Sequence, residues 1–338
     1  IGVIGCGGRG RRAHMTGVHA HSQTMNCEIV AVADPWKQRR EEAAHQAGQW
    51  YGRPAKAFVS YRDILAEDAI DAVMIASCDH QHTTHLKATA DAGKDVYCEK
   101  PETLTVREGR EMTNVARTYG RVLSGGSQRV WGDYNWFHKM VQGGRIGEVT
   151  ESWVNVGGPS GPCNFAPVET PPGVDWDLWL GPAPWRPYNP SLTKGNFRPF
   201  RDYSGGGMTD WGCHTFGGAL FALQLHKTGP TLILPPDGKD IQRLTYVFDN
   251  GVRIYHGGGW GGNLNFKGTE GEIGQIGDRN GNKAAPPNIH IPNYKGHGGI
   301  FGDFLHCVRT RERPFRDIEI AHRTATHCHL GNIAYWLN

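Results

Sequence analysis

The chain begins with IGVIGCGGRG (Ile1 to Gly10), and this stretch decides the fold of its first half. An apolar run leads directly into glycines at the spacing G-x-G-x-x-G, and helical sequence follows. The spacing alone is weak evidence, because 47 glycines in 338 residues will produce it by chance. Its place between a predicted strand and a predicted helix makes it specific. The stretch therefore predicts the strand, turn and helix that open a βαβ unit.

The glycines at this spacing have separate roles in a phosphate-binding turn. Gly5 allows the tight turn, Gly7 lets the backbone approach a pyrophosphate, and Gly10 lets helix and strand pack closely. The phosphates would lie at the helix N-terminus, where backbone N–H groups are free to donate. We therefore predict a dinucleotide site that includes Gly5, Gly7, Gly8, Arg9 and Gly10. The alternative is a glycine turn in the same fold that binds no dinucleotide.

A carboxylate in the expected place supports the dinucleotide. Asp34 closes the second predicted strand, IVAVADP, where it can accept hydrogen bonds from the hydroxyls of an adenosine ribose. A 2'-phosphate at this position would meet a like charge, so NAD is favoured over NADP. NADP stays possible because Lys37, Arg39 and Arg40 are close enough in sequence to hold a phosphate.

The first 125 residues alternate between short β-branched runs and helical stretches. Strands are predicted at 2–5, 29–34, 72–76, 95–98 and 121–124. Helices are predicted at 38–51, 81–93 and 105–119. This alternation is typical of βαβ units, which form a parallel sheet with right-handed crossovers.

After residue 127 the pattern changes. A predicted helix (133–142) and an alternating strand (148–156) precede a long segment rich in proline, glycine and tryptophan (157–201). Three more strands are predicted at 242–248, 252–257 and 263–268, and two closing helices at 300–311 and 318–337. We therefore predict two domains, 1–127 and an α+β domain at 128–338, with the last helix packing back on the first domain.

Composition disfavours several classes of partner. The formal charge is +3, from 36 basic and 33 acidic residues, without a run of like charges long enough for a nucleic-acid arm. There is no apolar run of about 18 residues, so we expect no membrane span. Eight cysteines occur without a CxxC pair, which favours buried thiols over a disulfide framework or a zinc ribbon.

Further motifs follow the glycine turn in a fixed order. They are ASCDHQH (76–82), AGKDVYCEKP (92–101), GSQRV (126–130), GRIGEV (144–149) and GGGMTDWGCH (205–214). Together they resemble the Gfo/Idh/MocA family of oxidoreductases over nearly the whole chain. E-K-P combined with D-x-x-x-H is far more specific than either motif alone.

The resemblance implies a fold class and an assembly. It implies an α/β protein with an N-terminal Rossmann doubly wound parallel sheet. A C-terminal α+β domain, built on a large, mostly antiparallel open sheet, would follow. Relatives often assemble through that sheet, so a homodimer or homotetramer is expected.

The resemblance also implies catalytic residues. Lys100 matches the family's lysine at the carboxyl edge of the parallel sheet, where open α/β folds bind ligands. His214 matches the family's acid/base residue. Asp210 lies four residues before it, on the same face of a predicted helix, and would orient the substrate or the histidine and favour the imidazolium. We expect these three groups to suit hydride transfer at a secondary carbinol.

Other matched positions are expected to contact the cofactor. They are Ser77, His80, His82, Glu99, Lys100 and Gln128, in addition to the glycine turn and Asp34. The chain departs from many relatives at Cys78 and Gln81, in the loop expected to flank the nicotinamide ribose.

These residues fit two functional classes and disfavour a third. The first is an NAD(P)-dependent dehydrogenase that acts on a sugar, sugar derivative or cyclitol. The second is a redox-neutral glycosidase that retains NAD and cleaves by transient oxidation and elimination. The third, a dinucleotide sensor without catalysis, would be expected to lack the set of Lys100, Asp210 and His214. The tryptophans from Trp176 to Trp185 fit either enzyme, because aromatic faces pack against the C–H surfaces of sugars.

Two questions stay open in the sequence. Histidines at HxH and HxxH spacing, His80 to His85 and His322 to His329, raise the possibility of a metal. They fall beside the dinucleotide turn and on a closing helix, so we predict no metal site. The first residues already form a predicted strand, so we expect further residues upstream. Both a cytoplasmic and a twin-arginine-exported periplasmic location stay possible.

Overall fold

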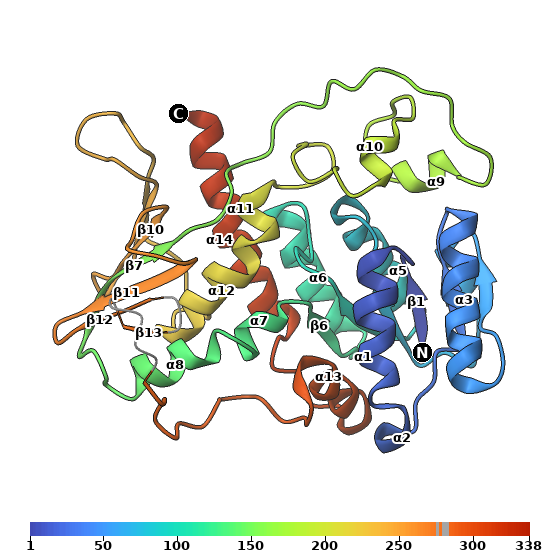
Figure 1. The fold of residues 1–338 in the computed structure, drawn as a ribbon, viewed down its shortest axis with the longest axis horizontal. Coiled ribbons are helices and arrows are strands. Elements are labelled where there is room, and N and C mark those ends of the chain that lie inside the picture. Colours follow the sequence, from blue (N-terminus) through green and yellow to red (C-terminus); the bar gives the residue numbers. More distant parts are fainter. Residues whose placement is uncertain (275–276, 279–283) are drawn as a thin grey trace. The chain divides into compact units, whose positions relative to one another are not determined.

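The computed structural model describes residues 1–274, 277–278 and 284–338. The chain divides into two compact units (Figure 1). The first contains Ile1–Gly126, Pro162–Ser204 and Asn293–Glu319, and the second contains Ser127–Gly161, Gly205–Pro292 and Ile320–Asn338. The first unit thus contains two later segments of the chain in addition to the N-terminal residues. The predicted division after residue 127 stays a prediction.

The first unit contains a parallel sheet of six strands in the order β3-β2-β1-β4-β5-β6. The strands are β1 (Gly2–Ile4), β2 (Ala31–Ala33), β3 (Lys56–Phe58), β4 (Ala72–Ile75), β5 (Asp95–Cys98) and β6 (Leu123–Gly125). The helices between them are η1 (Gly10–Met15), α1 (Thr16–His19), α2 (Ser22–Met25), α3 (Lys37–Tyr51), α4 (Tyr61–Leu65), η2 (Asp79–Gln81), α5 (His82–Asp91) and α6 (Val106–Thr118). The predicted doubly wound sheet is confirmed.

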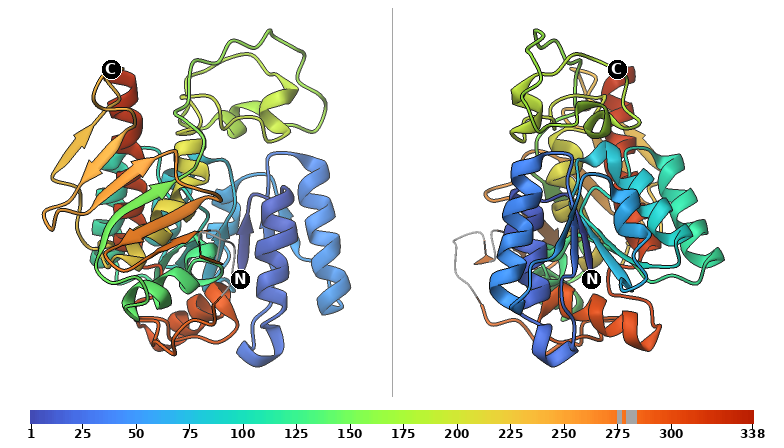
Figure 2. Two further views of the ribbon diagram at one scale, coloured as in Figure 1. Left: turned by 60° about the vertical axis from the view of Figure 1, so that its left-hand side comes forward. Right: turned by 90° about the vertical axis from the view of Figure 1, so that its right-hand side faces the viewer.

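Alternating side chains of the strands enter two separate cores, one on each face of the sheet. Val3 packs with α1, α3 and the later helix α13 (Gly299–Thr310), whereas its neighbour Ile4 packs with α4, α5 and α6. Tyr97 and Val96 on β5 divide in the same way. Helices therefore cover both faces of the sheet, as Figure 2 shows. Apart from the edge strand β3, the strands are buried on both faces, and their carboxyl ends lie at one edge of the sheet.

Residues 162–204, here called the tryptophan-rich segment, lie beyond those carboxyl ends (Figure 1). The segment contains two short helices, α9 (Trp176–Leu180) and α10 (Pro190–Thr193). It has its own apolar cluster, formed by Trp176, Trp179, Leu180, Tyr188, Leu192, Phe197 and Tyr203. Trp176 and Trp179 stack with their ring centroids 4.7 Å apart. The segment is therefore ordered by the packing of its own aromatic and aliphatic side chains.

The second unit is built on a sheet of seven strands in the order β13-β12-β11-β7-β10-β9-β8. They are β7 (Val149–Val154), β8 (Leu232–Leu234), β9 (Thr245–Val247), β10 (Arg253–His256), β11 (Leu264–Gly268), β12 (Glu272–Gly274) and β13 (Gly277–Asp278). All neighbouring pairs are antiparallel except β7 and β10. Its helices are α7 (Gln128–Trp131), α8 (Asn135–Gln142), α11 (Gly207–Asp210), α12 (Gly212–Ala222) and most of α14 (Ile318–Leu337). The predicted mostly antiparallel sheet is confirmed.

Apolar residues from α8, α12 and α14 form one core with the inner face of this sheet. Phe216 on α12 and Phe266 on β11 are both fully buried in it.

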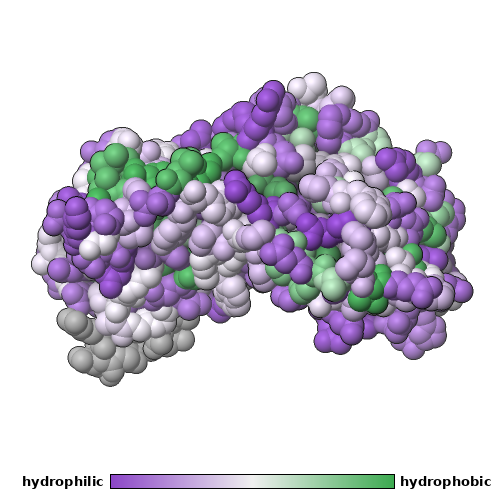
Figure 3. Space-filling view, turned by 90° about the horizontal axis from the view of Figure 1, so that it is seen from above, coloured by the Kyte–Doolittle hydropathy of each residue, from purple (hydrophilic) through white to green (hydrophobic). Residues whose placement is uncertain are grey.

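Hydrophilic and apolar side chains are interspersed on the face of the molecule seen in Figure 3. Within the ranges that the structure describes, no helix has both the length and the apolar character needed to cross a membrane.

Candidate cofactor-binding and active site

The glycine turn has the geometry that its spacing predicts. Gly5 adopts a φ of +88°, which only glycine takes without strain. A Cβ on Gly10 would lie 1.9 Å from the carbonyl oxygen of Gly5, so helix and strand are too close for any side chain there. A Cβ on Gly7 would have only Arg39 Nη1 nearby, at 3.8 Å, and one on Gly8 would meet nothing within 4 Å. The turn is thus closed behind Gly5 and Gly10 and open at Gly7 and Gly8.

Asp34 follows β2 beside this turn and is only 5% exposed. Its Oδ2 accepts a hydrogen bond from the backbone N–H of Cys6 and its Oδ1 one from Trp36, both at 2.8 Å. Burial raises the pKa of the carboxyl, and these N–H groups together with Arg39 limit the rise. A carboxylate has about four lone-pair sites, so it can still accept ribose hydroxyls.

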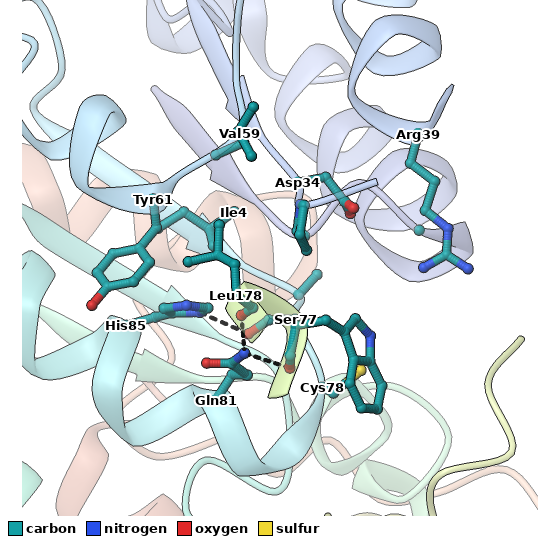
Figure 4. A pocket seen from close by; sticks show the side chains of 16 residues that line it. Ile4, Asp34, Arg39, Val59, Tyr61, Ser77, Cys78, Gln81, His85 and Leu178 are labelled. Atoms are coloured by element: carbon teal, nitrogen blue, oxygen red, sulfur yellow. Dashed lines mark hydrogen bonds between the residues drawn. The ribbon is translucent and has the colours of Figure 1, made fainter. Parts of the chain in front are cut away.

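A pocket of about 570 Å³, including its open mouth, lies between the turn and Asp34 (Figure 4). Four of the predicted cofactor residues line it: Gly5, Gly7, Asp34 and Ser77. The other lining residues are Ile4, Ala33, Pro35, Arg39, Val59, Tyr61, Ala76, Cys78, Gln81, His85, Leu178 and Trp179. All belong to the first unit. The pocket therefore lies at the carboxyl edge of β1, β2 and β4.

The histidines that follow β4 bind separate partners. His80 Nε2 is 3.0 Å from the carbonyl oxygen of Trp179, and His85 Nδ1 is 3.0 Å from Ser77 Oγ. Burial lowers the pKa of His80 to about 4 and that of His85 to about 3, so both rings are neutral near pH 7. His80 and His85 therefore contribute packing and hydrogen bonds as buried, neutral rings.

His82 joins two parts of the predicted site. Its Nδ1 is 2.6 Å from the carbonyl oxygen of Pro101, and its Nε2 is 3.1 Å from that of Ser77. Both partners are carbonyl oxygens, which only accept hydrogen bonds, so a ring N–H of His82 is the donor in either contact. His82 is 1% exposed, and it therefore fixes the backbone after Lys100 against the backbone after β4.

Glu99, which directly follows β5, binds Arg9 of the glycine turn. Its Oε1 accepts from Arg9 Nε at 2.7 Å and lies 3.0 Å from His14 Nε2. Burial alone would raise the pKa of Glu99, but His14, Arg9 and Lys100 around it hold that pKa well below its usual range. Glu99 is thus a buried carboxylate that links Arg9 of the turn to the backbone directly before Lys100.

Lys100 itself is partly exposed and is joined to Pro101 by a cis peptide bond. Glu102, two residues later, is 1% exposed. Burial raises its pKa to about 7, although buried Arg316 and the N–H of Gly126 oppose the rise. In the sequence Lys100 therefore stands between two buried carboxyl groups whose pKa values are shifted in opposite directions. That of Glu99 is lowered and that of Glu102 is raised.

The remaining predicted residues lie in the second unit. Gln128 begins α7, and Asp210 ends α11 one residue before Trp211. His214 lies in the first turn of α12 and is 5% exposed, and its backbone N–H donates to Trp211 at 3.0 Å. Asp210 is half-buried. Asp210 and His214 were predicted to share one face of a single helix, but they lie in two successive helices, α11 and α12, with Trp211 between them. Their proposed roles stay predictions.

Among the described residues no three His, Cys, Asp or Glu side chains come together as a metal-binding group. His327, one of the histidines that suggested a metal, stacks on Tyr246 with ring centroids 3.8 Å apart. Burial lowers its pKa to about 3. Its ring is therefore part of the core of the second unit.

The donor set fits a dinucleotide. The opening at Gly7 and Gly8 lies at the start of a helix, which suits phosphate, and Asp34 suits ribose hydroxyls. Sequence reasoning missed Val59, Tyr61, Leu178 and Trp179 in the pocket. Tyr61 follows β3, a strand that the sequence pattern did not predict, so its place at this edge of the sheet was missed together with the strand. Nothing in the sequence places Leu178 and Trp179 there.

Trp176 and Trp179 were expected to offer aromatic faces to a sugar. They are only 8% and 6% exposed, because both pack into the apolar cluster of the tryptophan-rich segment. Of the tryptophans in that stretch only Trp185 is open, with 74% exposed. Trp176 therefore offers little exposed ring surface to a ligand, and Trp179 lines the pocket beside the glycine turn. A sugar contact in this stretch stays a prediction.

Curated relatives match the first part of the chain. An inositol 2-dehydrogenase from Corynebacterium glutamicum is 29% identical over 151 residues, which is 44% of this chain and 42% of the relative. Inositol 2-dehydrogenase 3 from Saccharopolyspora erythraea is 32% identical over 151 residues, 44% of this chain and 41% of the relative. The matches thus span about two fifths of the length of these relatives.

Solved structures share the fold over nearly the whole chain. The WlbA dehydrogenase from Bordetella pertussis, in complex with NADH and UDP-GlcNAcA, has a TM-score of 0.68 at 18% identity, covering 98% of this chain and 95% of that one. A 3-ketoreductase from Actinomadura kijaniata, in complex with NADP and TDP-benzene, has a TM-score of 0.63 at 19% identity, covering 97% and 95%.

Two family models match in succession. Residues 1–127 match the NAD-binding Rossmann fold of an oxidoreductase family, and residues 151–338 match the C-terminal alpha/beta domain of the same family. Both order and extent agree with the glycine turn, the parallel sheet and the second sheet described above. The chain therefore belongs to the Gfo/Idh/MocA family of oxidoreductases.

Proposed function

We propose that this protein is an NAD(P)-dependent dehydrogenase that transfers hydride at a secondary hydroxyl of a sugar, sugar derivative or cyclitol. The observation that carries the proposal is the pocket between the open glycine turn and Asp34, at the edge of the sheet where Lys100 also lies. A bound nicotinamide would supply the hydride acceptor. The protein then has to remove a hydroxyl proton and stabilise the developing alkoxide.

The predicted residues suit these two tasks. In the proposal His214 takes the hydroxyl proton, because an imidazole titrates near neutral pH. The ammonium of Lys100 donates a hydrogen bond to the reacting oxygen as negative charge develops on it. Asp210 orients the substrate or His214 and favours the imidazolium. Glu99 and His82 hold the backbone on either side of Lys100, which limits the positions its side chain can reach.

The substrate class rests on the relatives. Two of them are named inositol 2-dehydrogenases, and inositol is a cyclitol with secondary hydroxyls only. The Asp34 carboxylate accepts hydrogen bonds from two backbone N–H groups, and no ion pair to it is seen among the described residues. A 2'-phosphate beside it would meet a like charge, which favours NAD over NADP. Arg39 lines the same pocket and stacks over Trp36 at 4.4 Å, so NADP is the alternative cofactor.

The test separates the dehydrogenase from a redox-neutral glycosidase. The purified protein is denatured and the supernatant assayed for NAD and NADP. The native protein is then incubated with NAD and a panel of cyclitols, sugars and aryl glycosides, with NADH and the aryl leaving group followed separately. NADH formation with a polyol supports the proposal. Release of the aryl group without net NADH would establish the glycosidase instead.

We further propose that the protein forms a homodimer or homotetramer through the outer face of the seven-stranded sheet. That face is opposite to the core formed with α8, α12 and α14. It carries partly exposed aromatic rings, with Trp153 stacked on Tyr255 at 5.4 Å and on the edge of Trp260 at 5.4 Å. The apolar side chain of Leu232 on β8 is 51% exposed on the same face. Aromatic rings of this kind are enriched at interfaces between subunits.

A further inference from the structure

We infer that the tryptophan-rich segment forms part of the dinucleotide site and slows exchange of the cofactor. The inference rests on the proposed function in one respect, because it takes the dinucleotide to occupy the pocket beside the glycine turn. It concerns residues that lie more than a hundred positions after that turn. Two groups of hydrogen bonds hold the segment in place, one on each side of the pocket.

The first group joins the segment to the loop between β2 and α3, next to Asp34. The backbone N–H of Lys37 donates to Gly173 at 2.7 Å, and that of Asp175 donates to Pro35 at 3.0 Å. Trp36 and Val174 form an antiparallel bridge between these two contacts. Arg39, which lines the pocket, also donates to the carbonyl oxygen of Thr193.

The second group joins the segment to the loop between β4 and α5. The side-chain amide of Gln81 donates to the carbonyl oxygens of Leu178 and Trp179, at 2.8 and 2.7 Å (Figure 4). Ser204 donates its hydroxyl to Asp79 Oδ2 at 2.6 Å, and both residues are at most 2% exposed. A buried hydrogen bond to a carboxyl group is among the stronger contacts in a protein.

Leu178 and Trp179 line the pocket between these two groups of contacts. Trp179 is held from behind by Trp176 and by Tyr203, at 4.7 and 5.5 Å between ring centroids. The segment therefore ties together the two loops that border the pocket. Because a dinucleotide in the pocket would lie against Leu178 and Trp179, its departure would require some of these contacts to break. We therefore expect slow dissociation.

The location of the site is tested on the wild-type protein by hydrogen–deuterium exchange with and without NAD. We expect NAD to slow exchange in the peptide that covers Trp176–Gly181 as well as in the peptide that covers the glycine turn. Protection of the glycine turn alone would overturn this inference and leave the proposed function intact. Protection of neither, with no measurable NAD binding, would overturn the proposed function itself.

The effect on exchange is tested by displacing bound NADH with excess NAD and following the loss of NADH fluorescence. Ser204→Ala removes an anchor without altering a residue that lines the pocket, and Gln81→Ala removes the two bonds to the segment. We expect each variant to release NADH at least tenfold faster than the wild type. Trp185→Ala, on the same segment but 74% exposed, is the matched control and should release it at the wild-type rate. Wild-type release rates in both anchor variants would overturn the inference.

Discussion

Arg9 donates its Nε–H to the carboxylate of Glu99, which stands 90 residues later in the sequence, at a distance of 2.7 Å. The contact joins the glycine turn to the end of β5, directly before Lys100. Glu99 is 4% exposed and also faces the buried ring of His14. One carboxylate thus couples the predicted phosphate-binding turn to the predicted catalytic lysine.

Replacing Glu99 with glutamine should weaken both stability and cofactor binding. The change removes the charge that Arg9 and His14 face, and losing a buried hydrogen bond to a charged group costs about 1–3 kcal/mol. Urea unfolding measures the stability, and titration with NAD measures the affinity. We expect a lower free energy of unfolding and weaker NAD binding, because the turn is no longer held.

Glu28→Gln is the matched control for this variant. Glu28 also pairs with an arginine, Arg53, at 2.6 Å, but both side chains are largely exposed. Exposed pairs contribute about 0–1 kcal/mol, so this variant should unfold and bind NAD nearly as the wild type does. Equal effects of the two substitutions would show that Glu99 has no special role in holding the turn.

Glu102 should make stability depend on pH in a defined window. Burial raises its pKa in the folded protein to about 7, against about 4.3 in an unfolded chain. Between these values the folded state binds a proton that the unfolded state has lost. The contribution of Glu102 to stability is therefore fully present below about pH 4.3, falls as the pH rises through 7, and levels off above it.

The measurement compares Glu102→Gln with the wild type by urea unfolding from pH 5 to pH 8. The free energy of unfolding of the wild type, relative to the variant, should fall by about 1.4 kcal/mol for each pH unit within the window. The fall should slow above pH 7 and have almost ended at pH 8. A difference between the two proteins that is constant over the whole range would mean that Glu102 is ionised in the folded state throughout.

Much of the first unit could be predicted because its strands and helices are marked by patterns of neighbouring residues. β-branched runs alternate with helical stretches, and the carboxyl ends of parallel strands must meet at one edge. That reasoning brings Gly5, Asp34 and Ser77 together, as the structure does. It missed β3, because Lys56–Phe58 is only three residues long and has no fully buried side chain to mark it.

The contacts of Leu178 and Trp179 could not be predicted in this way. They depend on Gln81, some 97 and 98 residues earlier, and no periodicity in the sequence relates the two. The short strands β8 and β12 were missed for a related reason. Each has three residues and is defined by the neighbour it pairs with rather than by its own pattern. Tertiary pairing, rather than local propensity, decided these elements.

Alanine substitutions in the glycine turn should separate folding from cofactor binding. Gly10→Ala places a Cβ 1.9 Å from the carbonyl oxygen of Gly5, so it should destabilise the protein by about 1–3 kcal/mol or more. Gly7→Ala places a Cβ in open space in the pocket, 3.8 Å from Arg39 Nη1. It should unfold nearly as the wild type does but bind NAD at least tenfold more weakly. Thermal unfolding and NAD titration check both results, and unchanged NAD affinity in Gly7→Ala would place the phosphates elsewhere.

His214→Asn tests the proposed acid/base residue. Loss of general acid/base assistance lowers turnover by about 10²-fold or more, whereas cofactor binding should be unchanged because His214 does not line the dinucleotide pocket. The measurement is turnover of whichever polyol the substrate panel identifies, together with NAD titration. Normal turnover in this variant would remove His214 from the proposed mechanism. A loss of NAD affinity equal to the loss of turnover would instead indicate a structural effect.

Trp153→Asp tests assembly through the outer face of the seven-stranded sheet. The substitution introduces a charge between Tyr255 and Trp260, where a subunit interface would have to desolvate it. We expect the mass in solution, measured by light scattering after gel filtration, to fall toward the 37.3 kDa of one chain. Trp185→Asp is the matched control, because Trp185 is exposed but belongs to the first unit, and it should leave the mass unchanged. If Trp153→Asp keeps the mass of the wild type, or if the wild type already has the mass of a single chain, assembly through this face is rejected. The aromatic rings would then serve to hold the Gly257–Gly262 loop, whose Trp260 N–H donates to Asn265 at 3.0 Å.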